Sequence, residues 1–216
     1  MTLLRIDASI QGARSASSAL ADLVTAEYTA ANPGESVRTR HIGADPLPSD
    51  LWAMAVGAAH TPPADRTPEQ AAALGRAKEI AGELSSADAV VLALPLYNWG
   101  VSQHVKAWID LAIVGSGPGA RLLDGTPTVL VTTRGGAYGP GTPKEGWDHS
   151  IDYLRRIVGD VWGSDLTVIE RELTLAEVTP AMAGLVDLAT TVKRQAEQAA
   201  VEAGRELART RGRAAA

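Results

Sequence analysis

The chain has 216 residues, and 45% of them are hydrophobic, which is ordinary for a globular protein with a buried core. Its formal net charge of −5 gives no electrostatic reason to bind nucleic acid or an anionic membrane. Because cysteine is absent, disulfides, thiolate nucleophiles and cysteine-ligated metal clusters are excluded, and any redox chemistry requires a bound cofactor.

No segment of the sequence has the pattern of a signal peptide or a membrane span. The charges of Arg5 and Asp7 interrupt the first apolar run too early for a signal peptide. No later run approaches the roughly 18 apolar residues that a transmembrane helix needs. We therefore expect a soluble, cytoplasmic protein.

Short β-branched runs alternate with longer helical stretches, a pattern typical of a parallel sheet covered by helices on both faces. The predicted strands span about 2–7, 37–42, 88–94, 127–133 and 165–171. Residues 88–94 form a continuous apolar run without alternation, as expected of a central strand buried on both faces. The sequence therefore predicts an α/β fold.

Helices are predicted between these strands. The first runs from Ser15 to about Ala30, and a second begins after Thr67, where an N-cap threonine, a proline and Gln70 form a capping box. Further helices are predicted at about 101–113, 146–158 and 180–209. Three segments rich in proline and glycine, 43–68, 115–127 and 134–146, are predicted to be loops within a single domain of residues 1–216 that ends in the long helix.

The loop after the first strand has the residues of a phosphate site. Ligands of an open parallel sheet bind beyond the carboxyl ends of its strands. A helix N-terminus offers N–H donors and a partial positive charge, to which serine hydroxyls add further donors. The candidate residues are Ser9, Ser15, Ala16 and Ser17. Alternatively, these serines only cap the helix. Both G-x-G-x-x-G and the P-loop motif are absent here, which favours a single phosphate.

Two further loops follow apolar strands. One provides aliphatic and aromatic side chains with an amide, which either pack a flat heteroaromatic ligand or cover the core. Its residues are Leu96, Tyr97, Asn98 and Trp99. The other contains paired glycines, which allow either a close approach to a ligand or a tight turn. Its residues are Thr133, Arg134, Gly135 and Gly136. Together the three loops indicate a mononucleotide with a broad ring system, of which FMN is the first candidate.

The same motifs resemble those of the bacterial FMN-dependent NADH-azoreductases, also described as NADH:quinone oxidoreductases. The similarity covers most of residues 1–160 and lies in Asp7-Ala-Ser9 with Ser15-x-Ser17, in 95–110, and in Thr133-Arg-Gly-Gly136. It implies a flavodoxin-like fold of five parallel strands in the order 2-1-3-4-5. It also implies that the serines hold the FMN phosphate, that Leu96 to Trp99 and Thr133 to Gly136 hold the isoalloxazine, and that the protein is a homodimer with flavin sites near the interface.

By this resemblance, NADH or NADPH reduces bound FMN, and a quinone or azo compound then takes two electrons. No side chain is assigned as catalytic because the flavin carries the chemistry. The histidines lack metal-ligand spacing, so no metal is expected. Segment 114–123 lacks the family's aromatic residues near the acceptor, which leaves open a pathway-specific flavin reductase with a specialised acceptor. A flavodoxin-like electron carrier is a second alternative, while a hydrolase is disfavoured because G-x-S-x-G is missing.

Overall fold

The computed structural model describes residues 2–214 and contains a parallel sheet of five strands in the order β2-β1-β3-β4-β5. The strands are β1 (Thr2–Asp7), β2 (Ser36–His41), β3 (Ala89–Ala93), β4 (Pro127–Thr133) and β5 (Asp165–Arg171). The predicted fold class and strand order are confirmed. Each predicted strand boundary lies within one residue of the observed one.

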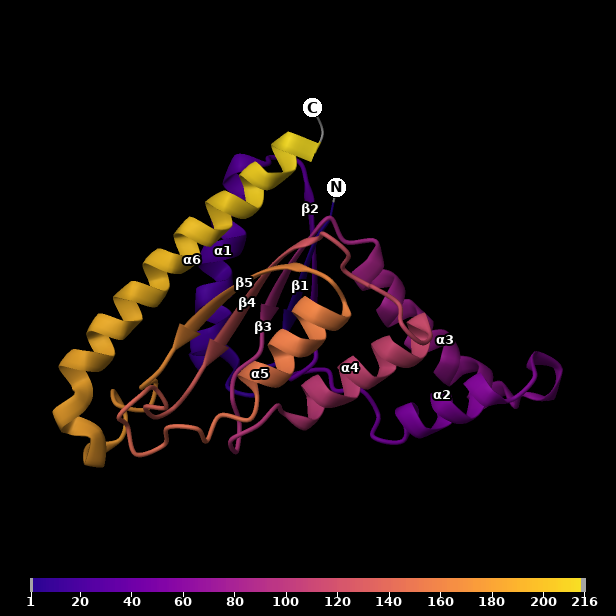
Figure 1. The fold of residues 1–216 in the computed structure, drawn as a ribbon, viewed down its shortest axis with the longest axis horizontal. Helices are drawn as coiled ribbons and strands as arrows, with labels where there is room; N and C mark the ends of the chain where they lie inside the picture. The colour runs from indigo at the N-terminus through magenta and orange to yellow at the C-terminus, as the bar shows by residue number, and fades with distance from the viewer. Residues whose placement is uncertain (1, 215–216) are drawn as a thin grey trace.

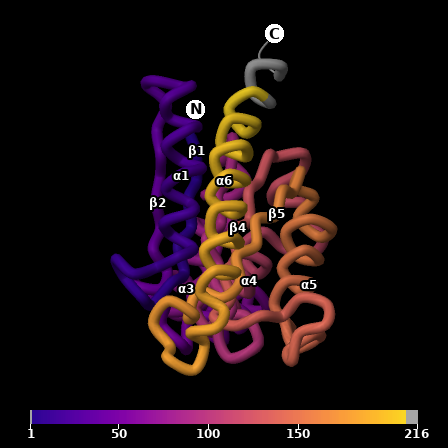
Figure 2. The backbone as a smooth tube through the Cα atoms, turned by 90° about the vertical axis from the view of Figure 1, so that its left-hand side faces the viewer, coloured from indigo at the N-terminus to yellow at the C-terminus, as the bar shows by residue number. Residues whose placement is uncertain are grey.

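Helices lie on both faces of this sheet (Figures 1 and 2). On one face, α1 packs beside the long C-terminal α6. On the other face lie α2, α3, α4 and α5, the last of which continues into a π-helix. Their bounds are α1 (Ala16–Ala31), α2 (Leu51–His60), α3 (Pro68–Ser85), α4 (Gln103–Ser116), α5 (Ile151–Leu154), the π-helix (Arg155–Val161) and α6 (Val186–Ala214). Short 3-10 helices span Gly12–Arg14, Pro63–Asp65 and Pro180–Leu185.

Successive side chains of a strand point to opposite faces of the sheet, so each strand contributes to two cores. Leu3 and Val91 pack in the core under α1 and α6. Leu4 and Leu92 pack in the core under α3 and α4, which includes the edge-to-face pair of Trp108 and Trp162. All five residues of β3 are buried, as its continuous apolar sequence predicts.

The capping box predicted at Thr67 is present. The hydroxyl of Thr67 accepts a hydrogen bond from the backbone N–H of Gln70, and the side chain of Gln70 accepts one from the N–H of Thr67, at 3.2 and 3.1 Å. Proline occupies the first position of α3, where its missing N–H costs no hydrogen bond. The start of α3 therefore follows from local sequence alone.

The prediction of a loop over 43–68 is wrong, because α2 occupies Leu51–His60. Its sequence, Leu-Trp-Ala-Met-Ala-Val-Gly-Ala-Ala, is apolar on every side and has no 3.6-residue periodicity that would identify a surface helix. Prolines and glycines in segment 43–68 favour a loop interpretation. Of its residues, only Ala55 and Ala58 are buried, so most of this apolar helix is partly or fully accessible.

Two other predicted helices have different bounds. The one expected over 146–158 begins at Ile151, and it widens into a π-helix in which the N–H of Trp162 bonds the carbonyl of Ile157 at 2.8 Å. The one expected over 180–209 begins as the 3-10 helix and becomes α-helical at Val186. Within residues 2–214, no helix has the length and apolar character that crossing a membrane requires.

Gly115 allows α3 and α4 to cross closely. A Cβ at this position would lie 2.0 Å from the carbonyl oxygen of Ala77. We expect Gly115→Ala to lower the free energy of unfolding by about 2 kcal/mol, because the helices must separate. Gly82→Ala is the matched control, since its Cβ would meet no atom within 4 Å; better helix propensity should raise stability there by about 0.5 kcal/mol. Urea denaturation measures both, and equal effects would contradict the close-crossing explanation.

Candidate functional site

The three loops that carry the predicted site residues meet at the carboxyl edge of the sheet. The hydroxyl of Tyr97 lies 3.2 Å from the Ser9 hydroxyl and accepts a hydrogen bond from the N–H of Ile10 at 3.1 Å. The N–H of Leu96 donates to the carbonyl of Thr133 at 3.0 Å. These bonds fix the loop after β3 between the loops after β1 and β4, as the sequence predicts.

The loop after β1 places the electropositive N-terminus of α1 at this edge of the sheet. Ser15 is the N-cap of α1: its hydroxyl accepts from the N–H of Ser18 at 3.0 Å and lies 3.2 Å from the hydroxyl of Ser17. Ser15 therefore does cap the helix, but the N–H groups of Ala16 and Ser17 have no intrahelical acceptor. In the described part of the chain, exposed Arg14 forms no ion pair through its side chain. The N-terminus of α1 is thus suited to an anion.

The second loop presents an indole in a strained conformation. Tyr97 and Gly100 pair as a short antiparallel bridge, with backbone hydrogen bonds of 3.2 and 3.0 Å. Between them Asn98 and Trp99 have φ values of 47° and 64°. Asparagine tolerates the left-handed region, whereas a bulky residue there is strained. Leu96 is buried, while Asn98 and Trp99 are exposed.

The third loop continues β4 past buried Thr133 to the paired glycines. A Cβ on Gly135 would lie 2.7 Å from Leu175, so this glycine permits a close contact with the segment after β5. The carbonyls of Gly135 and Gly136 accept hydrogen bonds from Leu175 and Leu173, both at 3.1 Å. One reason for a glycine at position 135 is therefore internal packing against Leu175.

Arg134 is buried in a cluster of carboxylates. Its guanidinium lies 2.5 Å from Asp148, 2.6 Å from Glu170 and 3.3 Å from Glu172. Burial disfavours the charged guanidinium, but Asp148 and Glu170 more than offset this and raise the pKa of Arg134 above its ordinary value. The side chain therefore ties the third loop to the end of β5, and contact between Arg134 and a cofactor stays a prediction.

Sequence reasoning missed two residues of this edge, Trp147 and Asp148. Asp148 bonds Arg134 and accepts from the N–H groups of Ser150 and Ile151, at 2.7 and 3.0 Å, which fixes the start of α5. Trp147 packs edge-to-face on Trp99, with ring centroids 6.2 Å apart. A tryptophan in a loop rich in glycine and proline is a usable indication of a binding surface, but its assignment to the helix predicted at 146–158 concealed it.

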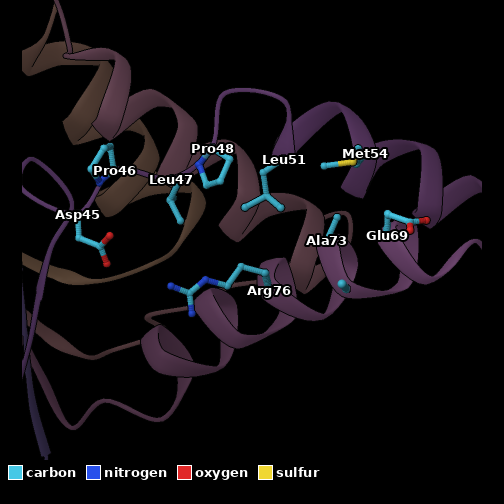
Figure 3. Close-up of a pocket in the computed structure, with 10 residues that line it drawn as sticks. Asp45, Pro46, Leu47, Pro48, Leu51, Met54, Glu69, Ala73 and Arg76 are labelled. Atoms are coloured by element: carbon cyan, nitrogen blue, oxygen red, sulfur yellow. The ribbon is translucent and has the colours of Figure 1, made fainter.

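A cavity of about 490 Å³ lies elsewhere, between the loop after β2, α2 and α3 (Figure 3). Prolines and aliphatic side chains form most of its lining, with Asp45, Glu69 and Arg76 as the charged members. None of the residues predicted to bind the cofactor lines it. The meeting loops are the better candidate, because they combine anion-binding N–H groups with an aromatic surface. Among residues 2–214, no three histidine, aspartate or glutamate side chains gather as a metal site.

The chain matches the model of a family described by a flavodoxin-like fold over residues 1–202. It is 38% identical over 191 residues to the FMN-dependent NADH:quinone oxidoreductase of Frankia alni, covering 86% of this chain and 90% of that protein. It is 37% identical over 211 residues to the FMN-dependent NADH:quinone oxidoreductase of Streptomyces avermitilis, covering 96% and 97%.

Solved structures share the same architecture. The azoreductase AzrA superposes with a TM-score of 0.77 and 20% sequence identity, covering 95% of this chain and all of that one (100%). An FMN-dependent NADH-azoreductase from Bacillus anthracis, solved in complex with FMN, gives a TM-score of 0.75 at 20% identity, with 96% and 100% covered. At this level of identity the likeness supports the fold.

The ion pairs of buried Arg134 lead to a prediction about stability. Arg134→Gln should lower the free energy of unfolding by about 3 kcal/mol, because it removes a buried guanidinium that pairs with three partly exposed carboxylates. Arg155→Gln is the control, since Arg155 is half exposed and also pairs with Glu170, at 3.1 Å; it should change stability by less than about 1 kcal/mol. Urea denaturation followed by circular dichroism compares the two, and similar losses would show that the cluster contributes no more than a surface ion pair.

Proposed function

Because this chain belongs to the family with the flavodoxin-like fold, we propose that it is an FMN-dependent reductase that moves two electrons from NADH to a quinone or azo acceptor. The observation that carries this function is the meeting of the α1 N-terminus and an aromatic loop at one sheet edge. The relatives with over a third of their residues identical are named as FMN-dependent NADH:quinone oxidoreductases. The enzyme is therefore an oxidoreductase.

The residues at this edge fit FMN. The N–H groups of Ala16 and Ser17, with the hydroxyls of Ser9, Ser15 and Ser17, would hold the phosphate. The donor set is neutral apart from Arg14, as suits a helix terminus that already carries partial positive charge.

The ring end of the cofactor would lie against the second and third loops. Leu96 to Trp99 provide apolar and aromatic surface, and Thr133 to Gly136 provide backbone groups, with the Arg134 side chain kept in its carboxylate cluster. Tyr97 has a bridging role, because its hydroxyl bonds the phosphate loop while its backbone belongs to the ring loop. Tyr97 thereby fixes the distance between the residues proposed to bind the phosphate and those proposed to contact the ring.

Bound FMN supplies the chemistry of accepting a hydride and passing on two electrons. The overall balance is NADH, H⁺ and a quinone giving NAD⁺ and a hydroquinone. The chain's own residues bind and orient: the α1 terminus holds the phosphate charge, and the indole of Trp99 keeps apolar surface at the ring end. We assign no side chain as proton donor or acceptor.

We further propose that the chain is a single domain that acts as a homodimer in the cytoplasm. The packing of α6 on α1, including the ion pair of Arg205 with Glu27 at 2.8 Å, supports one domain. Exposed apolar side chains in the segment beside Gly135 support an interface near the site; they are Leu175, Val178, Leu185 and Leu188. The relatives of this chain are named for NADH, a cytoplasmic metabolite, which supports the proposed location.

Turnover distinguishes an enzyme from an electron carrier. The FMN-loaded protein should oxidise NADH with a simple quinone at a steady rate of at least about 1 s⁻¹, the lower end for ordinary enzymes. The measurement is NADH absorbance with and without the quinone. A protein that holds FMN, fails to oxidise NADH and accepts electrons from a reduced protein donor would instead be a carrier.

The phosphate seat is tested by the double variant Ser15→Ala, Ser17→Ala. Loss of two hydrogen bonds to a charged group should weaken FMN binding by about 3 kcal/mol or more, or a hundredfold. Because Ser15 also caps α1, the matched control is Thr67→Ala, which removes the cap of α3 away from the site. Both variants should lose about 1 kcal/mol of stability. FMN titration by fluorescence should separate them, and equal FMN affinities would refute the assignment.

A further inference from the structure

Trp99 and Trp147 form an exposed aromatic pair at the candidate site. Their ring centroids are 6.2 Å apart with an interplanar angle of 66°, and the residues remain 46% and 51% exposed. The other tryptophan pair, Trp108 and Trp162, has the same edge-to-face geometry but is at most 1% exposed. Exposed aromatic surface gathered beside a functional site marks a binding surface.

The conformation of Trp99 shows that its placement is costly. In the left-handed backbone region, asparagine or glycine is favoured and tryptophan is not. The fold nevertheless holds Trp99 at φ 64°, through the paired backbone of Tyr97 and Gly100. Strain of this kind persists where the surroundings impose it and concentrates at ligand sites.

Trp147 is positioned from the following residues. The N–H of His149 donates to the carbonyl of Trp99 at 2.9 Å, which joins the loop after β4 to the loop after β3. Asp148 is held by Arg134 and by the start of α5. Trp147 lies between Gly146, which has a positive φ, and the fixed residues Asp148 and His149. The indole of Trp147 is therefore kept beside Trp99, although Trp147 is half exposed.

We propose that Trp147 is a specificity-determining residue, which with Trp99 forms an aromatic wall that selects fused-ring quinones over single-ring ones as electron acceptors. The inference rests on the proposed function. Segment 114–123 has no aromatic residue, whereas the loops after β3 and β4 each contribute an exposed tryptophan to the pair at the candidate site. A second fused ring gains stacking area on the indole, whereas a single ring gains little.

The test compares Trp147→Ala and Trp147→Phe in the FMN-loaded protein with Trp52→Ala as the control. Trp52 is equally exposed, at 47%, but lies on α2 and forms no ring pair among the described residues. The acceptors are menadione with two fused rings, 1,4-benzoquinone with one, and ferricyanide with none. Trp147→Ala should raise KM for menadione about tenfold, corresponding to about one lost stacking contact. Its kcat with ferricyanide and its FMN affinity should not change, and Trp147→Phe should recover most of the loss.

A binding measurement separates this inference from the proposed function. Menadione added without NADH should quench tryptophan fluorescence, and its Kd should rise about tenfold in Trp147→Ala. If the wild-type protein reduced neither quinones nor ferricyanide with NADH, the proposed function would fail. The fluorescence quenching would still measure whether Trp147 contributes to menadione binding. An unchanged menadione Kd and an unchanged ratio of the two quinone KM values would overturn the inference. Loss of FMN binding in Trp147→Ala would overturn it too, because Trp147 would then belong to the cofactor site.

Discussion

The site depends on the hydrogen-bond ladder between β3 and β4 continuing beyond the two strands. The N–H of Leu94 donates to Val131 at 2.9 Å, and that of Leu96 donates to Thr133 at 3.0 Å. Both strands are buried, so water does not compete for these bonds. The chain therefore leaves the sheet from two adjacent positions in fixed register, and the loops after β3 and β4 start side by side. The contacts between these two loops, including that of Trp99 with Trp147, depend on the loops starting side by side.

The two ends of the site are held by different means. At the phosphate end, the groups that would contact an anion are largely backbone N–H groups of α1, whose direction is fixed by the helix itself. At the ring end, side chains do the work, and they are positioned by long-range contacts such as Arg134 with Asp148. Tyr97 connects the ends through its hydroxyl. The phosphate end thus depends on the helix backbone together with nearby serine hydroxyls, whereas the ring end depends on side chains that distant residues position.

The difference explains what the sequence could predict. The strands at 2–7 and 127–133 were identifiable because their apolar and β-branched residues indicate burial, and the start of α3 because its cap is local. The helix α2 could not be identified, because a helix that is apolar on every side has no 3.6-residue hydrophobic periodicity. The cluster around Arg134 joins residues up to 38 positions apart, and no local pattern encodes such a pairing. Trp147 was missed for the same reason: its importance comes from Trp99, on another loop.

The aromatic pair has an evolutionary consequence. Trp99 and Trp147 come from separate loops, and neither side chain belongs to the buried cores that stabilise the sheet. Substitutions at the exposed indole of Trp147 leave the strand register and the α1 terminus untouched. Under the proposed role of Trp147, point mutations at this rim of the sheet change the preferred acceptor without altering the two buried cores.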